Sequence, residues 1–476
     1  MLNGSGTVTA TGSNAYSGGT VLAGGLLRVT AAGGPGSGAI SITGSAARVA
    51  LGSSVAVAND FIVDAPAGVV ANGVIQYEGA GTGRLAGGTV TVLGSPSSGG
   101  VFATTGGGTL IVEGPVSAPT GATVSMRIGT VVFAGGGTCG TFYVNEGTAR
   151  VGRNNGLPAS ATVTVGASAA ATLDLAGYDQ SLAGLLKGPG AATVGSSSTT
   201  RDATLTITGS SAFAGVIANS VAGGTRRTNL AVDGGWLRLT GTSTLTGTTS
   251  VRSGTLQIAA SAGLASSPLR LLAGGRLEVT GSTAVSIAGL DLAAGGLVDL
   301  GMGRLTIAAG GIAEANLVAA LAAGRADGGW QGTTGLTSSL VAESVARGIP
   351  RGIGWLAGGG GSLTVAIAAP GDANLDGVID VLDAAALTAE GRFDSGQAAA
   401  WANGDFTYDG VVDILDVSEA IGTGLFDAGS YQAGAIVAVP EPVLSPVLAT
   451  CAVLLTITAV RSSPCRVPAA KVTTAS

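Results

Sequence analysis

The sequence contains no histidine, and it is poor in aromatic and charged residues. Among its 476 residues, 4% are aromatic and 11% are charged, whereas an ordinary globular domain carries about 25% charged residues. Without histidine, a Ser-His-Asp triad and a histidine-ligated metal site are excluded. Because the net charge is −6 and no long run of Lys and Arg occurs, no nucleic-acid partner is expected. The three cysteines, Cys139, Cys451 and Cys465, form no CxxC pair, so no disulfide framework is predicted.

What the chain has in abundance is glycine and small apolar residues. It holds 84 glycines, 46% of it is hydrophobic, and its mean hydropathy is +0.51, which argues against full disorder. These values favour a β protein outside the cytoplasm. The first residues resemble the middle of a repeat and carry no signal peptide, which leads us to expect further chain upstream.

Residues 1–311 consist of short stretches in which apolar residues alternate with polar ones, broken by Gly, Ser, Asn and Thr. A period of two indicates strands with one buried face. Three twelve-residue copies align without gaps, at residues 18–29, 140–151 and 247–258. Such repeats suit the stacked turns of a β-solenoid, with Leu27, Ala149 and Leu256 pointing inward. At about 20–25 residues and about 4.8 Å per turn, the stretch predicts about 12–15 turns. An array of β-sandwiches is the alternative.

The repeats resemble the autotransporter-associated β-strand repeat family. The residues that carry the likeness lie in 14–29, 133–151 and 246–258, where Gly-Gly or Gly-Thr turns precede a short strand. The resemblance implies a right-handed parallel β-helix exposed on a bacterial surface. We nevertheless expect no self-transporting autotransporter, because the 106 residues after Pro370 leave little room for a translocator barrel.

Residues 312–369 form a transitional segment. We expect a short helix near residues 315–325 and a last strand at 362–367, and the four glycines at 358–361 are interpreted as a hinge. The segment around Trp330 resembles the connection between such repeats and a calcium module in planctomycete-type exported proteins.

Residues 370–431 form an acidic module that contains twelve acidic residues and one basic residue. Two twelve-residue loops within it, 372–383 and 405–416, place oxygen-bearing side chains at positions 1, 3, 5, 9 and 12 and glycine at position 6. Ca²⁺ binds six to eight oxygens, and alternating loop positions turn their side chains toward one centre. The pattern predicts two Ca²⁺ sites, each followed by a helix that starts near position 12. The predicted ligands, which include two backbone carbonyls at position 7, are Asp372, Asn374, Asp376, Val378, Asp380, Asp383, Asp405, Thr407, Asp409, Val411, Asp413 and Asp416.

The duplicated loops resemble dockerin type I, a small α-helical docking module. Two departures stand out. Thr407 replaces the usual Asn or Asp at position 3, which predicts a weaker second site. Positions 10 and 11 are Val381-Leu382 and Ile414-Leu415, where cellulosomal dockerins often carry small hydroxyl residues that contact cohesin.

The C-terminal region follows a linker, 432–442, that contains Pro-Glu-Pro. Residues 443–460 are free of charge, and Arg461, Arg466 and Lys471 lie in the tail 461–476. Eighteen residues of helix span about 27 Å, just enough for a bilayer core. The region resembles a PEP-CTERM sorting tail, which implies processing by an exosortase-type enzyme. An ordinary single-pass anchor in the membrane is the alternative.

Taken together, the chain is expected to be mainly β: a right-handed parallel β-helix, then a small calcium-binding module, then a transmembrane helix. We expect a non-enzymatic structural or adhesive protein, exported to the cell envelope, the cell surface or the extracellular space, with a protein or polysaccharide partner. The alternative is a polysaccharide-active or carbohydrate-binding β-helix protein that is recruited through a dockerin-cohesin-type interaction, since β-helices host such activities. It would need a carboxylate pair in a groove, and the solenoid offers few, none near an aromatic platform: Asp60/Asp64, Asp174/Asp179 and Asp291/Asp299.

Overall fold

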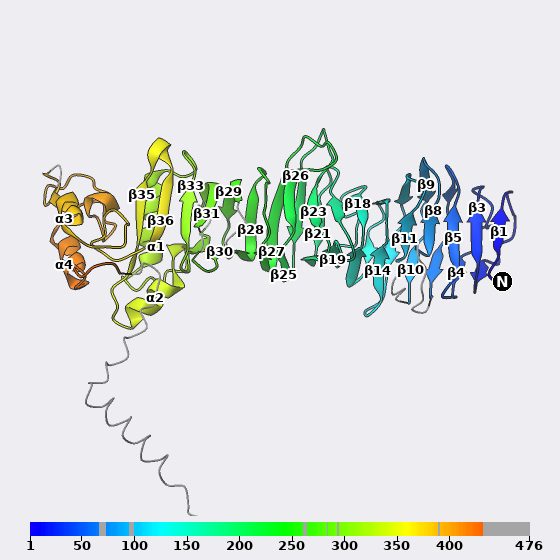
Figure 1. Cartoon of the computed structure of the whole chain (residues 1–476), viewed down its shortest axis with the longest axis horizontal. Coiled ribbons are helices and arrows are strands. Elements are labelled where there is room, and N and C mark those ends of the chain that lie inside the picture. Colours follow the sequence, from blue (N-terminus) through cyan, green and yellow to red (C-terminus); the bar gives the residue numbers. More distant parts are fainter. Residues whose placement is uncertain are drawn as a thin grey trace, which may run out of the picture. The chain divides into compact units, whose positions relative to one another are not determined.

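The computed structural model describes residues 1–65, 73–94, 100–259, 264–282, 284–292, 295–388 and 391–431. Up to residue 337 these residues form a β-solenoid of about 13 turns, in which the strands of successive turns lie side by side (Figure 1). The sequence predicted this solenoid, and the sandwich array was the wrong alternative.

Three parallel sheets build the first part of the solenoid. The first contains β1 (Thr7–Ala10), β3 (Leu26–Val29), β5 (Arg48–Leu51), β8 (Ile75–Tyr77), β11 (Phe102–Thr104), β14 (Thr123–Met126), β17 (Thr141–Val144), β19 (Thr162–Val165) and β22 (Gly184–Lys187). The second contains β2 (Thr20–Leu22), β4 (Ile40–Ile42), β7 (Phe61–Val63), β10 (Val90–Val92), β13 (Val116–Ser117) and β16 (Gly137–Thr138). The third contains β6 (Ala56–Val57), β9 (Thr82–Leu85), β12 (Thr109–Val112), β15 (Thr130–Phe133), β18 (Gly147–Val151), β20 (Ala171–Asp174), β23 (Ala192–Ser196) and β26 (Val216–Ser220).

A fourth sheet of 13 strands completes the solenoid. Its path runs through β21 (Gln180–Leu182), β24 (Ala203–Ile207), β27 (Thr228–Leu239), β28 (Thr249–Ile258), β29 (Leu264–Leu271), β31 (Ala284–Asp291), β33 (Arg304–Ile307), β36 (Leu363–Ala368) and β35 (Gly352–Ala357). Beside this path lie β25 (Ser211–Phe213), β30 (Gly275–Val279), β32 (Leu297–Asp299) and β34 (Gly335–Thr337). In β28, Gly254 (φ +80°) gives the strand the left-handed backbone that turns the corner from one face to the next.

The apolar alternation of the sequence fills the interior of the solenoid. Leu27, Ala149 and Leu256 are 3%, 0% and 0% exposed, as predicted from the aligned copies. The chain advances by 18 residues from Val131 to its partner Ala149, and other turns are longer, such as the 29 residues from Phe61 to its partner Val90. Because the buried doublets of each turn cover those of the next, stacking rather than any single turn removes the apolar surface from water.

The parallel stack ends at a hairpin. Helix α1 (Glu314–Arg325), where a short helix was expected, and helix α2 (Ser339–Ala346) precede it. Strand β36 then pairs antiparallel with β33 and with β35. The four glycines at 358–361, interpreted above as a hinge, form the loop of this hairpin, which includes η1 (Gly359–Gly361), because the two flanking strands are paired along their length. The strand expected at 362–367 is β36.

The acidic module contains helices α3 (Val381–Thr388) and α4 (Ile414–Gly422) and the short η3 (Trp401–Asn403). Within the described part of the chain, none of the helices has the length and apolar character required to cross a bilayer. The linker 432–442, the predicted span 443–460 and the tail 461–476 lie outside the described residues.

Candidate metal centres

Each acidic loop leads directly into a helix. Helix α3 begins at Val381 and helix α4 at Ile414, which is position 10 of each loop and not position 12 as the sequence predicted. The reason is local. The carboxylates of Asp380 and Asp413, at position 9, accept hydrogen bonds from the backbone N–H groups two residues later, and such caps satisfy the free donors at a helix start. Position 9 therefore starts the helix, and position 12 lies in its first turn.

The backbone is left-handed at the same two positions in both loops. Position 4 is left-handed at Leu375 (φ +60°) and Tyr408 (φ +64°), and position 6 at Gly377 (φ +85°) and Gly410 (φ +88°). A non-glycine residue with positive φ is uncommon and costs strain unless its surroundings hold it. The repeated conformation shows that the two loops share one structure.

In the first loop, Asp372 and Asp383 are buried and accept hydrogen bonds from the loop backbone. Asp372 accepts from the N–H groups of Asp376 and Gly377, and from the phenol of Tyr431 at 2.5 Å. Asp383 accepts from positions 2, 3 and 9 of the loop. The hydrogen bonds to Asp383 connect the start of the loop to its end.

The second loop repeats this arrangement but leaves two oxygens without a partner. Asp416 accepts from positions 2, 3 and 9, and Oδ2 of Asp405 accepts from the N–H of Gly410 at 3.1 Å. Oδ1 of Asp405 and Oγ1 of Thr407 are buried, and neither has a hydrogen-bond partner among the described residues. They belong to positions 1 and 3, where two ligands were predicted. An unsatisfied buried polar atom costs about 1–3 kcal/mol, and a bound cation would satisfy both oxygens.

One buried carboxyl group in each loop has a raised pKa. Burial, with the nearby charges of Asp416 and Asp409, raises the pKa of Asp405 to about 7. Burial also raises the pKa of Asp372, with a smaller contribution from the charge of Asp383. A carboxylate that is costly to ionise in the absence of metal is stabilised when a divalent cation lies beside it.

The remaining predicted ligands lie nearer the surface. Asn374, Asp376 and Asp409 are exposed, and Oδ1 of Asn374 accepts from the N–H of Asp376 at 2.8 Å. Five further predicted ligand residues are half-buried: Val378, Asp380, Thr407, Val411 and Asp413. Across the described residues, no three side chains of Asp, Glu or Cys gather closely enough to form a metal cluster by themselves. Each predicted ligand set contains four Asp side chains of this class, so the described structure does not gather them into one cluster.

Residues that the sequence analysis did not single out hold the module against the end of the solenoid. Trp401 is fully buried and donates from Nε1 to the carbonyl of Asp372 at 2.7 Å. Tyr408 donates to the carbonyl of Ile353 in β35, and Arg325 of α1 forms an ion pair with Glu419 of α4. The aromatic residues interleaved with the second loop were the available signal, since a large buried side chain needs a surface to cover it.

Four of the six solenoid carboxylates named in the sequence analysis accept hydrogen bonds from neighbouring turns. Asp174, fully buried, accepts from Nε of Arg150 at 2.7 Å and from the N–H groups of Ala176 and Ser197. Asp299 repeats this pattern, with Arg276, Gly301 and Ser339 as its partners. Each of the two carboxylates thus joins three successive turns. Asp60 and Asp179 each accept one backbone N–H from the following turn.

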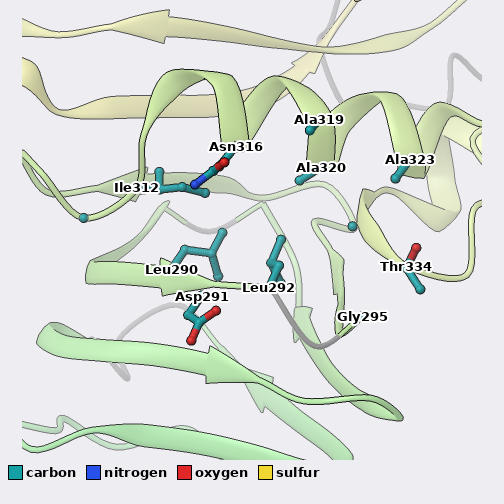
Figure 2. Close-up of a pocket in the computed structure, with 12 residues that line it drawn as sticks. Leu290, Asp291, Leu292, Gly295, Ile312, Asn316, Ala319, Ala320, Ala323 and Thr334 are labelled. Atoms are coloured by element: carbon teal, nitrogen blue, oxygen red, sulfur yellow. The ribbon is translucent and has the colours of Figure 1, made fainter.

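A hollow of about 580 Å³ lies between β31, helix α1 and β34. Figure 2 shows Leu290 and Leu292 pointing toward α1, and Asp291 pointing away from it. Asp291 forms an ion pair with Arg270 at 3.2 Å, and its predicted partner Asp299 does not line the hollow. The two carboxylates are therefore not brought together as a pair in this groove.

Comparison with known proteins adds no relative: no family model, no curated protein and no solved structure matches this chain.

Proposed function

We propose that residues 370–431 bind two Ca²⁺ ions and that the chain is a non-enzymatic structural protein of the cell envelope or the extracellular space. The observation that carries the proposal is the pair of buried, unsatisfied oxygens on Asp405 and Thr407. Both belong to residues at ligand positions of a loop whose backbone repeats that of the first loop. Ca²⁺ supplies the missing partner, because it binds carboxylate and hydroxyl oxygens together with backbone carbonyls.

The ligand sets follow the loop positions. Asp372, Asn374, Asp376, Asp380 and Asp383, with the carbonyl of Val378, hold the first ion. Asp405, Thr407, Asp409, Asp413 and Asp416, with the carbonyl of Val411, hold the second. The second site is the weaker, since a neutral hydroxyl replaces an amide oxygen at position 3.

Calorimetric titration of the calcium-free full chain with Ca²⁺ tests this proposal. We expect two binding events, the loss of the weaker one in Asp405→Asn, and the loss of the tighter one in Asp376→Ala. Asp394→Asn is the matched control, because Asp394 is an exposed carboxylate of the same module outside both loops. Absence of calcium uptake at millimolar concentration, together with a melting temperature that chelator does not change, would rule the proposal out.

The remainder of the proposal concerns the solenoid and the tail. The stacked turns form a right-handed spacer or adhesive stalk, as the repeat resemblance implies. Export ends in anchoring or sorting through residues 443–460 and an exosortase-type processing step, supported by the uncharged run and its basic flank. Fractionation of a chain tagged at its C-terminus tests this step: the precursor should be found in membranes.

A docking role for the module is favoured by one observation. Positions 10 and 11 of the two loops expose four large apolar side chains, Val381, Leu382, Ile414 and Leu415, to between 57% and 69%. Their equivalent placement at the starts of α3 and α4 fits a protein partner with an apolar surface. Binding to an immobilised panel of cohesin modules, with Val381→Ser and Ile414→Ser as variants, tests this role.

A further inference from the structure

A second cavity lies where the acidic module meets the end of the solenoid. This junction cavity has a volume of about 340 Å³, within the range of about 300–1,000 Å³ typical of small-molecule sites. Its walls come from α1 and the turn after it, from α2, from the start of β35, and from η3, α4 and the second acidic loop. The lining residues include two arginines, three aromatic residues and two prolines: Arg325, Arg351, Trp330, Trp401, Phe406, Pro350 and Pro370.

Among the described residues, one charged residue that lines the junction cavity has no counter-charge. Arg351 is only 8% exposed, and its hydrogen bond is to the carbonyl of the preceding Pro350, at 2.9 Å. Its guanidinium lies 4.9 Å from the centre of the Tyr431 ring. No carboxylate of a described residue forms an ion pair with it, whereas the more exposed Arg150 and Arg325 both pair with carboxylates. A buried guanidinium is costly unless an anion and further hydrogen bonds compensate it.

The other charged groups of the cavity leave this positive charge uncompensated. Arg325 and Glu419 neutralise each other in an ion pair. Asp327 lies on the lining as well, but it is exposed, and its Oδ1 accepts from the N–H of Gly329. Burial lowers the pKa of Arg351, as expected for a cation that has left water without an anionic partner.

We propose that the junction cavity binds a small organic monocarboxylate, whose carboxylate pairs with Arg351. A planar guanidinium presents parallel N–H donors that match the two oxygens of a carboxylate. The aromatic and proline walls favour an organic body over a bare inorganic anion. The carboxylates of Asp327 and Glu419 disfavour a ligand with a second negative charge, such as a phosphate dianion. The site is additional to the calcium loops and requires no enzymatic step.

Calorimetric titration of the calcium-loaded full chain with benzoate, glucuronate and acetate tests the proposal. Benzoate has an apolar body, glucuronate a hydroxylated one and acetate almost none, so their order of affinity identifies the ligand class. We expect benzoate to bind most tightly, while benzamide and inorganic phosphate bind at least about tenfold more weakly, since neither offers a monovalent carboxylate.

Variants on two different elements separate binding from folding. Arg351→Met should weaken benzoate binding about tenfold or more, and Arg351→Lys should give an intermediate loss because the planar fork is missing. Val345→Phe, from the α2 wall, should reduce binding by filling the cavity while Arg351 is retained. The control is Arg347→Met, an exposed arginine paired with Glu343 on α2, which should bind as the unmodified chain does.

The proposal is overturned if none of the three carboxylates binds at millimolar concentration. It is also overturned if a folded Arg351→Met or Val345→Phe chain binds benzoate as tightly as the Arg347→Met control. Calcium binding is measured in a separate titration of the same chains, so a failure of the calcium proposal is distinguishable from a failure of this one.

Discussion

The phenol of Tyr408 donates a hydrogen bond to the backbone carbonyl of Ile353. Tyr408 occupies position 4 of the second acidic loop, and Ile353 lies in β35 at the end of the solenoid sheet. The ring is buried against Trp330, at 5.8 Å between centroids, and Trp401, at 5.7 Å. The loop that is proposed to bind Ca²⁺ therefore also covers the end of the β-stack, and the terminal turns of a solenoid require such a cover.

Removal of the Tyr408 hydroxyl should weaken the packing of the acidic module on the end of the solenoid. We expect Tyr408→Phe to lower the free energy of unfolding by about 1–2 kcal/mol, because the carbonyl of Ile353 loses its donor while the ring remains in place. Chemical denaturation followed by circular dichroism measures the change. Tyr143→Phe is the control, since Tyr143 is 37% exposed. Equal stability of the two variants would show that the hydrogen bond contributes little.

The carboxylate of Asp174 should contribute strongly to the stability of the solenoid. Asp174→Ala leaves Arg150 and the N–H groups of Ala176 and Ser197 without their acceptor, so we expect a loss of about 3 kcal/mol. Asp60→Ala removes a single contact at an exposed site, a hydrogen bond to Thr89, and should cost about 1 kcal/mol or less. Urea denaturation of both variants checks the difference. A fully stable Asp174→Ala chain would contradict this assignment.

The inward position of Leu256 predicts a cost for truncation. Leu256 is 0% exposed and pairs with Leu237 and Leu277 of the neighbouring turns. Leu256→Ala leaves a cavity in this stack and should cost about 2–5 kcal/mol. Arg252→Ala, in the same strand and exposed, should change stability by less than about 0.5 kcal/mol. The thermal midpoints of the two variants provide the comparison.

The calcium-free chain should become less stable as the pH rises from about 4 to about 7. The pKa of Asp405 is raised from 3.8 to about 7, chiefly by burial, so within this window the folded state holds a proton that the unfolded state releases. By linkage, a group that binds its proton more tightly when folded stabilises the fold at low pH and loses that contribution as the pH passes its folded pKa.

Calcium should remove this pH dependence, because the cation takes the place of the proton beside Asp405. The measurement is the melting temperature against pH, with chelator and with excess Ca²⁺. Asp405→Asn should flatten the calcium-free profile. A calcium-free profile that rises between pH 4 and 7 would contradict the argument.

The apolar alternation and the glycine positions of the sequence were enough to predict the solenoid and the burial of Leu27, Ala149 and Leu256. The solenoid and this burial depend on the two-residue alternation of apolar and polar residues within each strand and on the stacking of similar turns. The alternation is local and the turns are repeated, so both can be recognised in the sequence. The presence of a helix directly after each acidic loop was also predicted, because the loop and the helix are adjacent in the chain. The residue at which the first helix starts was predicted less well. It starts at Val381, because the carboxylate of Asp380 accepts from the backbone N–H of Leu382.

The remaining features were decided by contacts between segments far apart in the chain. Asp174 is one of the few solenoid carboxylates that the sequence offers to the enzymatic alternative, and only the neighbouring turns show that its oxygens accept from Arg150 and from backbone N–H groups. The packing of Tyr408 on Ile353 and the burial of Arg351 arise where the module covers the solenoid. Sequence periodicity cannot report such relationships, because the free energy of burying a hydroxyl or a guanidinium depends on what the fold places beside it.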